Sequence, residues 1–171
     1  MNRRPLYIFD LDGTLALIDH RRHYVERPAC PYCGWHEMCD HSHDGTRPVF
    51  TPNWDKFYAE CVNDQPNIPV IAVFQMLFRH ADIHIFSGRS DVVLSETTGW
   101  LQEHVHKHFD KLWMRKEGDY TPDHDLKRGW YFGLPEEDKQ RLVAIFDDRD
   151  KVVAMWRELG LTCFQVAPGA F

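Results

Sequence analysis

The chain lacks a long hydrophobic run and an excess of positive charge. No apolar stretch approaches the roughly 18 residues of a membrane-spanning helix, and Met1–Pro5 lacks the apolar region of a signal peptide. We therefore expect no membrane partner and a cytoplasmic location with reduced thiols. Lys and Arg total 20 against 26 Asp and Glu, a formal net charge of −6. Proteins that bind many nucleic-acid phosphates are normally basic. This net charge is therefore compatible only with a local basic patch that contacts a few phosphates at a polynucleotide end.

The chain also lacks internal repeats and low-complexity tracts. Its 171 residues, 43% of them hydrophobic, are enough to bury one core. Alternating apolar runs and amphipathic segments predict strands at 6–10, 83–86, 111–114, 142–146 and 162–166. Helices are predicted at 54–62, 67–80, 91–108 (capped by Ser90), 123–132 and 149–159 (ending at Gly160). The alternation predicts a single α/β domain over residues 1–171, with a Rossmann-like parallel sheet of about five strands and helices on both faces.

An apolar run ends in two aspartates, Asp10 and Asp12, followed by Gly13 and Thr14. Residues two apart on a strand point to one face, so both carboxylates can face one substrate. Gly13 permits a sharp turn there. One carboxylate can attack phosphorus or hold a divalent cation, while its neighbour, if protonated, donates a proton to the leaving oxygen. A solvated strand end with a turn is the alternative for two aspartates alone.

Three further polar clusters follow in the order that a phosphoryl-transfer site needs. Ser87–Arg89 follows a predicted strand and can cradle a phosphate. Lys127 can neutralise charge on a phosphoryl group, and Asp147–Arg149 brings a second carboxylate pair suited to Mg²⁺. Taken singly, these clusters are a common turn, a surface charge and a helix N-cap. Their joint occurrence favours phosphoryl transfer.

These clusters resemble the four motifs of the haloacid dehalogenase superfamily of phosphohydrolases. In order, the matching segments are Asp10–Thr14, Phe86–Arg89, Lys127 and Asp147–Asp148. Within that superfamily the chain is most similar to the 3′-phosphatase domains of bacteriophage polynucleotide kinase-phosphatases. This likeness rests on Ser87–Arg89, Arg115–Asp119 and Phe146–Phe171, and it leaves out only the segment from about residue 26 to 52.

The resemblance implies a Mg²⁺-dependent phosphomonoesterase that forms an aspartyl-phosphate. Asp10 is then the nucleophile, Asp12 the proton donor and later the base, and Lys127 the third catalytic residue. The Mg²⁺ site implied by the resemblance consists of Asp10, Asp12 through its backbone carbonyl, Asp147 and Asp148. Substrate contacts are expected from Thr14, Ser87, Gly88 and Arg89.

One motif of the two-domain relatives is absent. Their kinase module carries a G-x-x-x-x-G-K-[ST] loop, and the printed sequence has none. We therefore expect a free-standing phosphatase half, with any kinase or ligase as a separate partner, or a relative that acts on another phosphomonoester.

A segment rich in Pro, Gly and Asp interrupts the α/β rhythm. We expect a cap insertion at about 18–55, with a possible zinc loop at 27–52. The candidate Zn²⁺ ligands are Cys30, Cys33, Cys39 and either His41 or His43. Such a metal would be structural and would order a loop that is poor in apolar residues. A flexible insertion or a disulfide is the alternative.

Residues next to this insertion are candidates for substrate contact. Arg21 and Arg22 are predicted to bind a phosphodiester backbone, and Tyr24, Trp35 or Trp54 to stack on a base. Alternatively, the aromatic residues pack the cap onto the body and the arginines are solvated.

Two other groups of residues have plainer explanations. His104 and His108 would share a helix face at i, i+4, but a polar face is favoured over a metal site. Cys61 and Cys163 lie in apolar surroundings and are expected in the core.

Three functions remain open on the sequence. The first is removal of a 3′-phosphate from a DNA or RNA end in nucleic-acid repair. The second is a phosphatase of small substrates such as nucleoside monophosphates. The third is a non-catalytic module that binds a partner through the cysteine-rich loop, against which the intact motifs argue.

Overall fold

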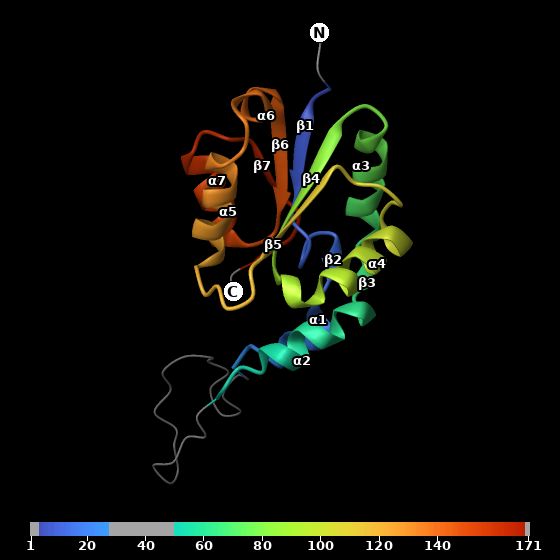
Figure 1. Ribbon diagram of the computed structural model, residues 1–171, viewed down its shortest axis with the longest axis vertical. Coiled ribbons are helices and arrows are strands. Elements are labelled where there is room, and N and C mark those ends of the chain that lie inside the picture. The colour runs from blue at the N-terminus through green and yellow to red at the C-terminus, as the bar shows by residue number, and fades with distance from the viewer. Residues whose placement is uncertain (1–3, 28–49, 170–171) are drawn as a thin grey trace.

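A computed structural model describes residues 4–27 and 50–169 of the chain. It shows an α/β fold built on a parallel sheet (Figure 1). Five parallel strands lie in the order β5-β4-β1-β6-β7. Their bounds are β1 Leu6–Phe9, β4 Asp82–Ser90, β5 Lys111–Arg115, β6 Leu142–Asp147 and β7 Cys163–Gln165. The predicted five-stranded parallel sheet is thus confirmed.

Helices cover both faces of this sheet (Figure 1). They are α3 (Ile68–Phe78) and α4 (Leu94–His104) on one face, and α5 (Asp123–Phe132) and α7 (Asp150–Glu158) on the other. Successive strand residues supply the two cores, because neighbouring side chains point to opposite faces. Phe9 and Ile85 pack in the core under α3 and α4, whereas Ile8 and Phe86 pack in the core under α5 and α7.

A small group of elements lies beyond the carboxyl ends of the strands (Figure 1). It consists of α1 (Asp19–Arg22), α2 (Trp54–Ala59), the 3₁₀ helix η1 (Glu60–Asn63), and the antiparallel pair β2 (Ala16–Leu17) and β3 (Gln65–Pro66). In open α/β sheets the ligand crevice lies at this end. The predicted cap region therefore lies where it can border a site.

The helix predicted at 91–108 is shorter than expected. Ser90 accepts a hydrogen bond from the Val92 amide, as an N-cap does, but the first turn is a 3₁₀ helix, η2 (Asp91–Val93), and α4 ends at His104. After His104 the chain returns to the sheet: the Asp110 carboxylate accepts a hydrogen bond from the Ile83 amide of β4, and β5 begins at the next residue. His108 therefore lies beyond the helix, and the face that it was predicted to share with His104 does not form.

Other details of the fold differ little from the sequence-based expectations. Cys61 and Cys163 are buried, as predicted for core residues. The last helix ends just before Gly160, whose positive φ of 76° suits glycine. Helix α6 (Glu136–Arg141) was not predicted, because its six residues are all polar or charged and carry no apolar periodicity.

Candidate active site

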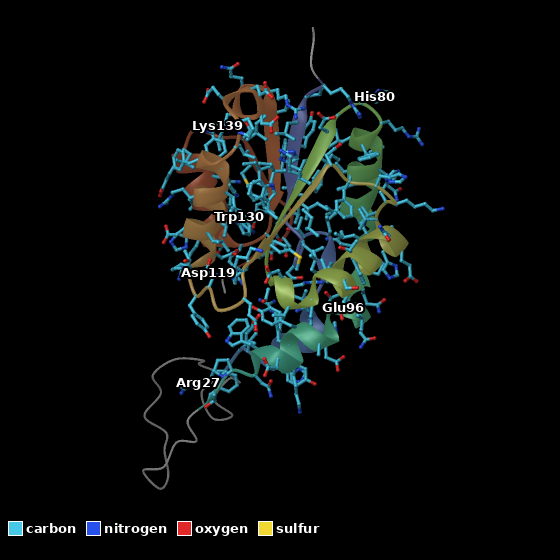
Figure 2. All side chains as sticks on the ribbon, in the orientation of Figure 1. Arg27, His80, Glu96, Asp119, Trp130 and Lys139 are labelled. Atoms are coloured by element: carbon cyan, nitrogen blue, oxygen red, sulfur yellow. The ribbon has the colours of Figure 1, made fainter. Side chains whose placement is uncertain are left out.

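Polar side chains gather where β1, β4 and β6 end. Asp10 directly follows β1, Ser87–Ser90 closes β4, and Asp147 ends β6. Lys127 reaches the same point from the middle of α5. In Figure 2, Asp119 marks the loop between β5 and α5, which lies at the same end of the sheet. The four predicted motifs are thus brought together.

Lys127 occupies the centre of this cluster and is almost completely buried, with 1% of its surface exposed. Its Nζ donates to Asp10 Oδ1 at 2.6 Å and to Asp147 Oδ2 at 2.9 Å, and it lies 3.4 Å from Asp123 Oδ2. Burial alone would lower the pKa of Lys127, but these three carboxylates raise it well above its ordinary value. The side chain is therefore a fixed positive charge.

Three carboxylates surround a position that suits a divalent cation. One oxygen each from Asp10, Asp147 and Asp148 lies within 4.8 Å of the others. Asp10 Oδ2 is buried and has no hydrogen-bond partner among the described residues. A buried carboxylate oxygen without a partner is costly, and hard cations such as Mg²⁺ prefer oxygen ligands of this kind. The residues present therefore fit such a metal.

The charges of this cluster are not balanced by Lys127 alone. Burial raises the pKa of Asp10 well above its ordinary value, even though the charge of Lys127 lowers it. Burial and the neighbouring Asp147 raise the pKa of Asp148 to about 6. Such shifts indicate excess negative charge in a desolvated place. A bound cation would relieve that excess.

Asp12 is held by two arginines on the other side of the cluster. Arg21 Nη2 donates to Asp12 Oδ1 at 2.8 Å, and Arg89 binds both oxygens of Asp12. The same two guanidinium groups share a second, buried carboxylate, Asp64, at 2.6 to 2.8 Å. Two arginines and two aspartates thus form one network that fixes the Asp12 side chain.

This network governs the protonation of Asp12. Burial alone would raise its pKa, but the charges of Arg89 and Arg21 outweigh burial and lower the pKa to about 2. A carboxyl group with this pKa is ionised at neutral pH. The expectation that Asp12 is protonated at the start of the reaction does not match this arrangement, which favours the carboxylate.

The two arginines predicted to bind a phosphodiester backbone lie in different surroundings. Arg21 is completely buried, packs over the ring of Phe57 and binds Asp12 and Asp64. The prediction that Arg21 contacts substrate is therefore wrong for this structure, because its guanidinium is enclosed. Arg22 lines the cleft described below and pairs with Glu26 at 2.7 Å.

Two further predicted substrate contacts are enclosed by protein atoms. Thr14 is buried, and its Oγ1 lies 3.5 Å from Asp148 Oδ1, where it supports that carboxylate rather than facing the cleft. Arg89 is likewise almost fully buried beneath Asp12, although it contributes atoms to the cleft wall. The tight turn that brings these groups together depends on Gly13, which has φ +90° and leaves no room for a Cβ beside Asp148.

The end of β4 presents the predicted phosphate cradle. The register of β4 against β5 shifts between Ser87 and Ser90, so Arg89 turns toward Asp12 while Gly88 faces the cleft. Ser87 is buried, and its Oγ accepts a hydrogen bond from the Arg89 amide. A side chain at position 88 would collide with the Asp123 carboxylate. Glycine is therefore required for this close approach.

Three residues at the site were not predicted from the sequence. Asp64 completes the arginine network, Asp123 contacts Lys127, and Arg115 joins the β5–α5 loop to the Gly88 carbonyl. Asp123 lies four residues before Lys127, a helical spacing that placed both on one face of α5. Asp64 lies in a turn between η1 and β3, and no local pattern distinguishes it from a solvated aspartate.

The network around Asp64 gives a testable prediction. Asp64→Asn should destabilise the fold by roughly 3 kcal/mol, because two buried guanidinium groups would lose one of their two carboxylates. Activity should fall as well, since Asp12 would lose its fixed position. Urea unfolding measures the first effect. Asp19→Asn is the matched control, because the Asp19 side chain is 82% exposed, and equal stability of the two variants would contradict a structural role for Asp64.

A cleft of about 460 Å³ opens above Asp10 and Asp12. Its walls come from α2, the residues around Arg22, the end of β4 and the β5–α5 loop. The basic side chains that line it are Arg22, Arg89, Arg115, Lys116, Lys127 and Arg149. The acidic side chains are Asp10, Asp12, Glu26, Asp55, Glu117, Asp119, Asp123 and Asp148. The described walls are thus not a basic surface.

The candidate zinc ligands, Cys30, Cys33, Cys39, His41 and His43, lie outside the described residues. The structure therefore neither assembles nor separates them. Within residues 4–27 and 50–169, no helix has the length and apolar character needed to cross a bilayer.

Comparison with known families gives a match over most of the chain. The sequence model described as the phosphatase domain of polynucleotide kinase PNKP matches residues 43–171, which include the second, third and fourth motifs. A protein of Autographa californica nuclear polyhedrosis virus, described as a bifunctional polynucleotide kinase/RNA ligase, is 33% identical over 135 residues. That match covers 75% of this chain and 19% of the viral protein.

Solved structures give the same fold. A chain of the Pnkp1/Rnl/Hen1 RNA repair complex superposes with a TM-score of 0.70 and 29% identity, over 98% of this chain and 44% of that one. A haloacid dehalogenase-like hydrolase of Streptococcus pneumoniae superposes with a TM-score of 0.54 and 15% identity, over 96% of this chain and 85% of that one. This chain thus spans less than half of the viral protein and of the repair-complex chain.

Proposed function

Because this chain belongs to the family of polynucleotide kinase PNKP phosphatase domains, we propose that it removes 3′-phosphates from polynucleotide ends in nucleic-acid repair. The observation that carries the proposal is Asp10 below an open cleft: one of its oxygens lies within 4.8 Å of oxygens of Asp147 and Asp148, and its buried Oδ2 has no hydrogen-bond partner among the described residues. The names of the viral relative and of the repair complex favour RNA as the strand, and the name of the complex favours separate repair proteins as partners.

The proposed reaction has two steps. A carboxylate oxygen of Asp10 attacks the phosphorus, the bond from phosphorus to the 3′-oxygen breaks, and the leaving oxygen takes a proton from Asp12. Water then attacks the aspartyl-phosphate, gives its proton to the Asp12 carboxylate and releases phosphate, which restores Asp10. Lys127 orients Asp10 by binding Oδ1 and stabilises negative charge that develops nearby.

The donor role of Asp12 requires that substrate change its pKa. A dianionic phosphate in the cleft adds negative charge beside Asp12 and competes for the charge of Arg89, and both effects raise the pKa of Asp12 from about 2. Mg²⁺ held by Asp10, Asp147 and Asp148, with the Asp12 backbone carbonyl as a further ligand, would supply charge neutralisation at the phosphate oxygens. Gly88 is the proposed phosphate contact because it lines the cleft, whereas Ser87 is fully buried outside the described lining and supports the turn through the Arg89 amide.

The direct test is phosphate release from matched substrates. A 3′-phosphorylated oligonucleotide, its 5′-phosphorylated counterpart and nucleoside monophosphates are compared, as RNA and DNA, with Mg²⁺ or with EDTA. We expect Mg²⁺-dependent release from the 3′-phosphorylated strand, with Asp10→Asn as the blank. Release from the 5′-phosphorylated strand at an equal rate would overturn the assignment to 3′ ends.

A phosphatase of small substrates is the second candidate. The described cleft lining, with eight acidic and six basic side chains, favours it, because a long phosphate backbone would meet as much repulsion as attraction there. Preference for nucleoside monophosphates in the same assay would select this function.

The charge of the cleft also predicts a shallow salt dependence. Each phosphate neutralised on a single strand contributes about −0.7 to the slope of log affinity against log salt. We expect a slope no steeper than about −2, because only the terminal phosphate and one or two neighbours find basic partners. Binding of a labelled oligonucleotide at increasing NaCl concentrations measures the slope. A slope near about −5 would require an extended basic surface and would contradict this prediction.

A further inference from the structure

We propose that Tyr120, together with Trp54, forms a stacking platform that binds the last bases of a single-stranded 3′ end. This inference rests on the proposed function and deepens it, since it names the feature of the substrate that the cleft recognises beyond its terminal phosphate. The ligand chemistry is an unpaired nucleobase, and the site is the rim of the cleft above Asp10.

Tyr120 is the most exposed large apolar or aromatic side chain in the described part of the chain. Its exposed fraction is 90%, whereas the next most exposed, Ile68, reaches 63%. Tyr120 nevertheless lines the cleft. A tyrosine ring offers a large, flat surface with few rotatable bonds, so it binds a planar partner at low entropic cost.

The loop that carries Tyr120 is fastened on its inner side by Arg115. Arg115 Nε donates to the Gly88 carbonyl at 2.8 Å, which ties the loop to the phosphate cradle. Its Nη1 donates to the carbonyls of Asp119 and Thr121, the two neighbours of Tyr120. The backbone on both sides of the ring is therefore held.

The outer side of the loop is fastened by Asp91 at the start of η2. Its carboxylate accepts hydrogen bonds from Lys116 Nζ and from the Glu117 amide, both at 2.8 Å. Within the loop, Asp119 accepts a hydrogen bond from the Thr121 amide at 2.8 Å. These hydrogen bonds hold the backbone that carries Tyr120 at the cleft before substrate arrives, and such preorganisation lowers the cost of binding.

A second aromatic surface lines the cleft from α2. Trp54 is 47% exposed and stacks on Tyr58, with ring centroids 5.8 Å apart and an interplanar angle of 29°. The N-cap Asn53, whose side chain accepts a hydrogen bond from the Lys56 amide, fixes the start of the helix. The cleft thus carries aromatic rings on two separate elements.

Few basic side chains of the cleft are available to bind the phosphates of the strand, so we expect the aromatic rings to recognise it. Arg89 and Lys127 are buried in the catalytic cluster, and Arg115 holds the loop. Acidic side chains outnumber basic ones along the described walls. Stacking on aromatic rings tolerates any sequence and needs no phosphate contact, but it requires bases that are not paired in a duplex. We therefore expect preference for single-stranded over blunt double-stranded ends.

The test compares two labelled hexanucleotides that end in a 3′-phosphate, one normal and one with its last three positions abasic. Fluorescence anisotropy measures their binding to the full chain without need for turnover. The normal strand should bind roughly tenfold more tightly than the abasic one. Tyr120→Ala should remove most of the difference, Trp54→Ala should remove a smaller part, and Tyr120→Phe should preserve the difference because the ring remains.

Phe132→Ala is the control, since Phe132 is 56% exposed on α5 and outside the described cleft lining. Equal binding of the two strands by the unmodified chain, or a base preference that is undiminished in Tyr120→Ala, would overturn the platform. Phosphate release from the same strands is measured separately and reports on the proposed function. A base preference without release from either strand would reject the 3′-phosphatase assignment and leave the platform standing.

Discussion

Asp10→Asn is expected to lower kcat for phosphate release by at least about four orders of magnitude while the fold stays intact. The amide has the size of the carboxylate, but its oxygen and nitrogen are poor nucleophiles and weak ligands for Mg²⁺. Lys127 can still donate to the amide oxygen, so the buried cluster keeps one of its hydrogen bonds. Phosphate release at saturating substrate, together with thermal unfolding, measures the two parts of this prediction.

Asp125→Asn is the matched control for that experiment. Asp125 lies on α5 near Lys127 in sequence, but its side chain is 44% exposed and pairs with Arg128. We expect this variant to retain the unmodified rate. An Asp10→Asn variant that turned over substrate at a near-normal rate would refute the nucleophile assignment, whatever the substrate.

Lys127→Met is expected to destabilise the fold by roughly 3–5 kcal/mol at pH 7. The substitution would leave the carboxylates of Asp10, Asp123 and Asp147 without the ammonium group that now lies within 3.4 Å of each. Urea unfolding measures the loss. Lys151→Met, on the exposed face of α7, is the control and should lie within about 0.5 kcal/mol of the unmodified chain.

The stability of Lys127→Met should fall as pH rises and should increase when Mg²⁺ is added. Without Lys127, the pKa values of Asp10 and Asp148 in the folded state should rise further above their unfolded values. The folded state then binds more protons, so stability is present at low pH and lost as pH rises through the raised values, including that of Asp148, already about 6. Mg²⁺ should restore part of the stability at pH 8, because it binds only the folded state. A variant no more stable at pH 5 than at pH 8 would contradict this account.

The carboxylates of the candidate active site were predictable from the sequence because they follow strands. Asp10 and Asp147 each come where an apolar run stops, and the carboxyl ends of parallel strands meet at one edge of a sheet. Local pattern and tertiary position agree in such cases. The five-stranded sheet was predictable for the same reason, since its strands are short apolar runs.

Residues that act on Asp12 were harder to predict. Arg21 lies among polar residues in a short helix, where an arginine side chain is normally exposed to solvent. Its burial in the protein interior is explained by the ion pair with the buried Asp64. The two residues are 43 positions apart, so no local pattern relates them. The low pKa of Asp12 depends first on Arg89 and then on Arg21, whereas the family resemblance implied that Asp12 starts the reaction protonated.

The base of the cap insertion is closed by contacts between its two ends. Ala16 and Leu17 of β2 pair with Pro66 and Gln65 of β3, and Arg21 binds Asp64 just beyond that ladder. When the two ends of a segment are held together in this way, a change in its length has a small effect on stability, because doubling the length of a flexible loop adds only about 0.6 kcal/mol to the free energy of loop closure. We therefore expect insertions and deletions between α1 and α2 to leave Asp12 undisturbed, so the length of this segment can vary without change at the turn from Asp10 to Asp12.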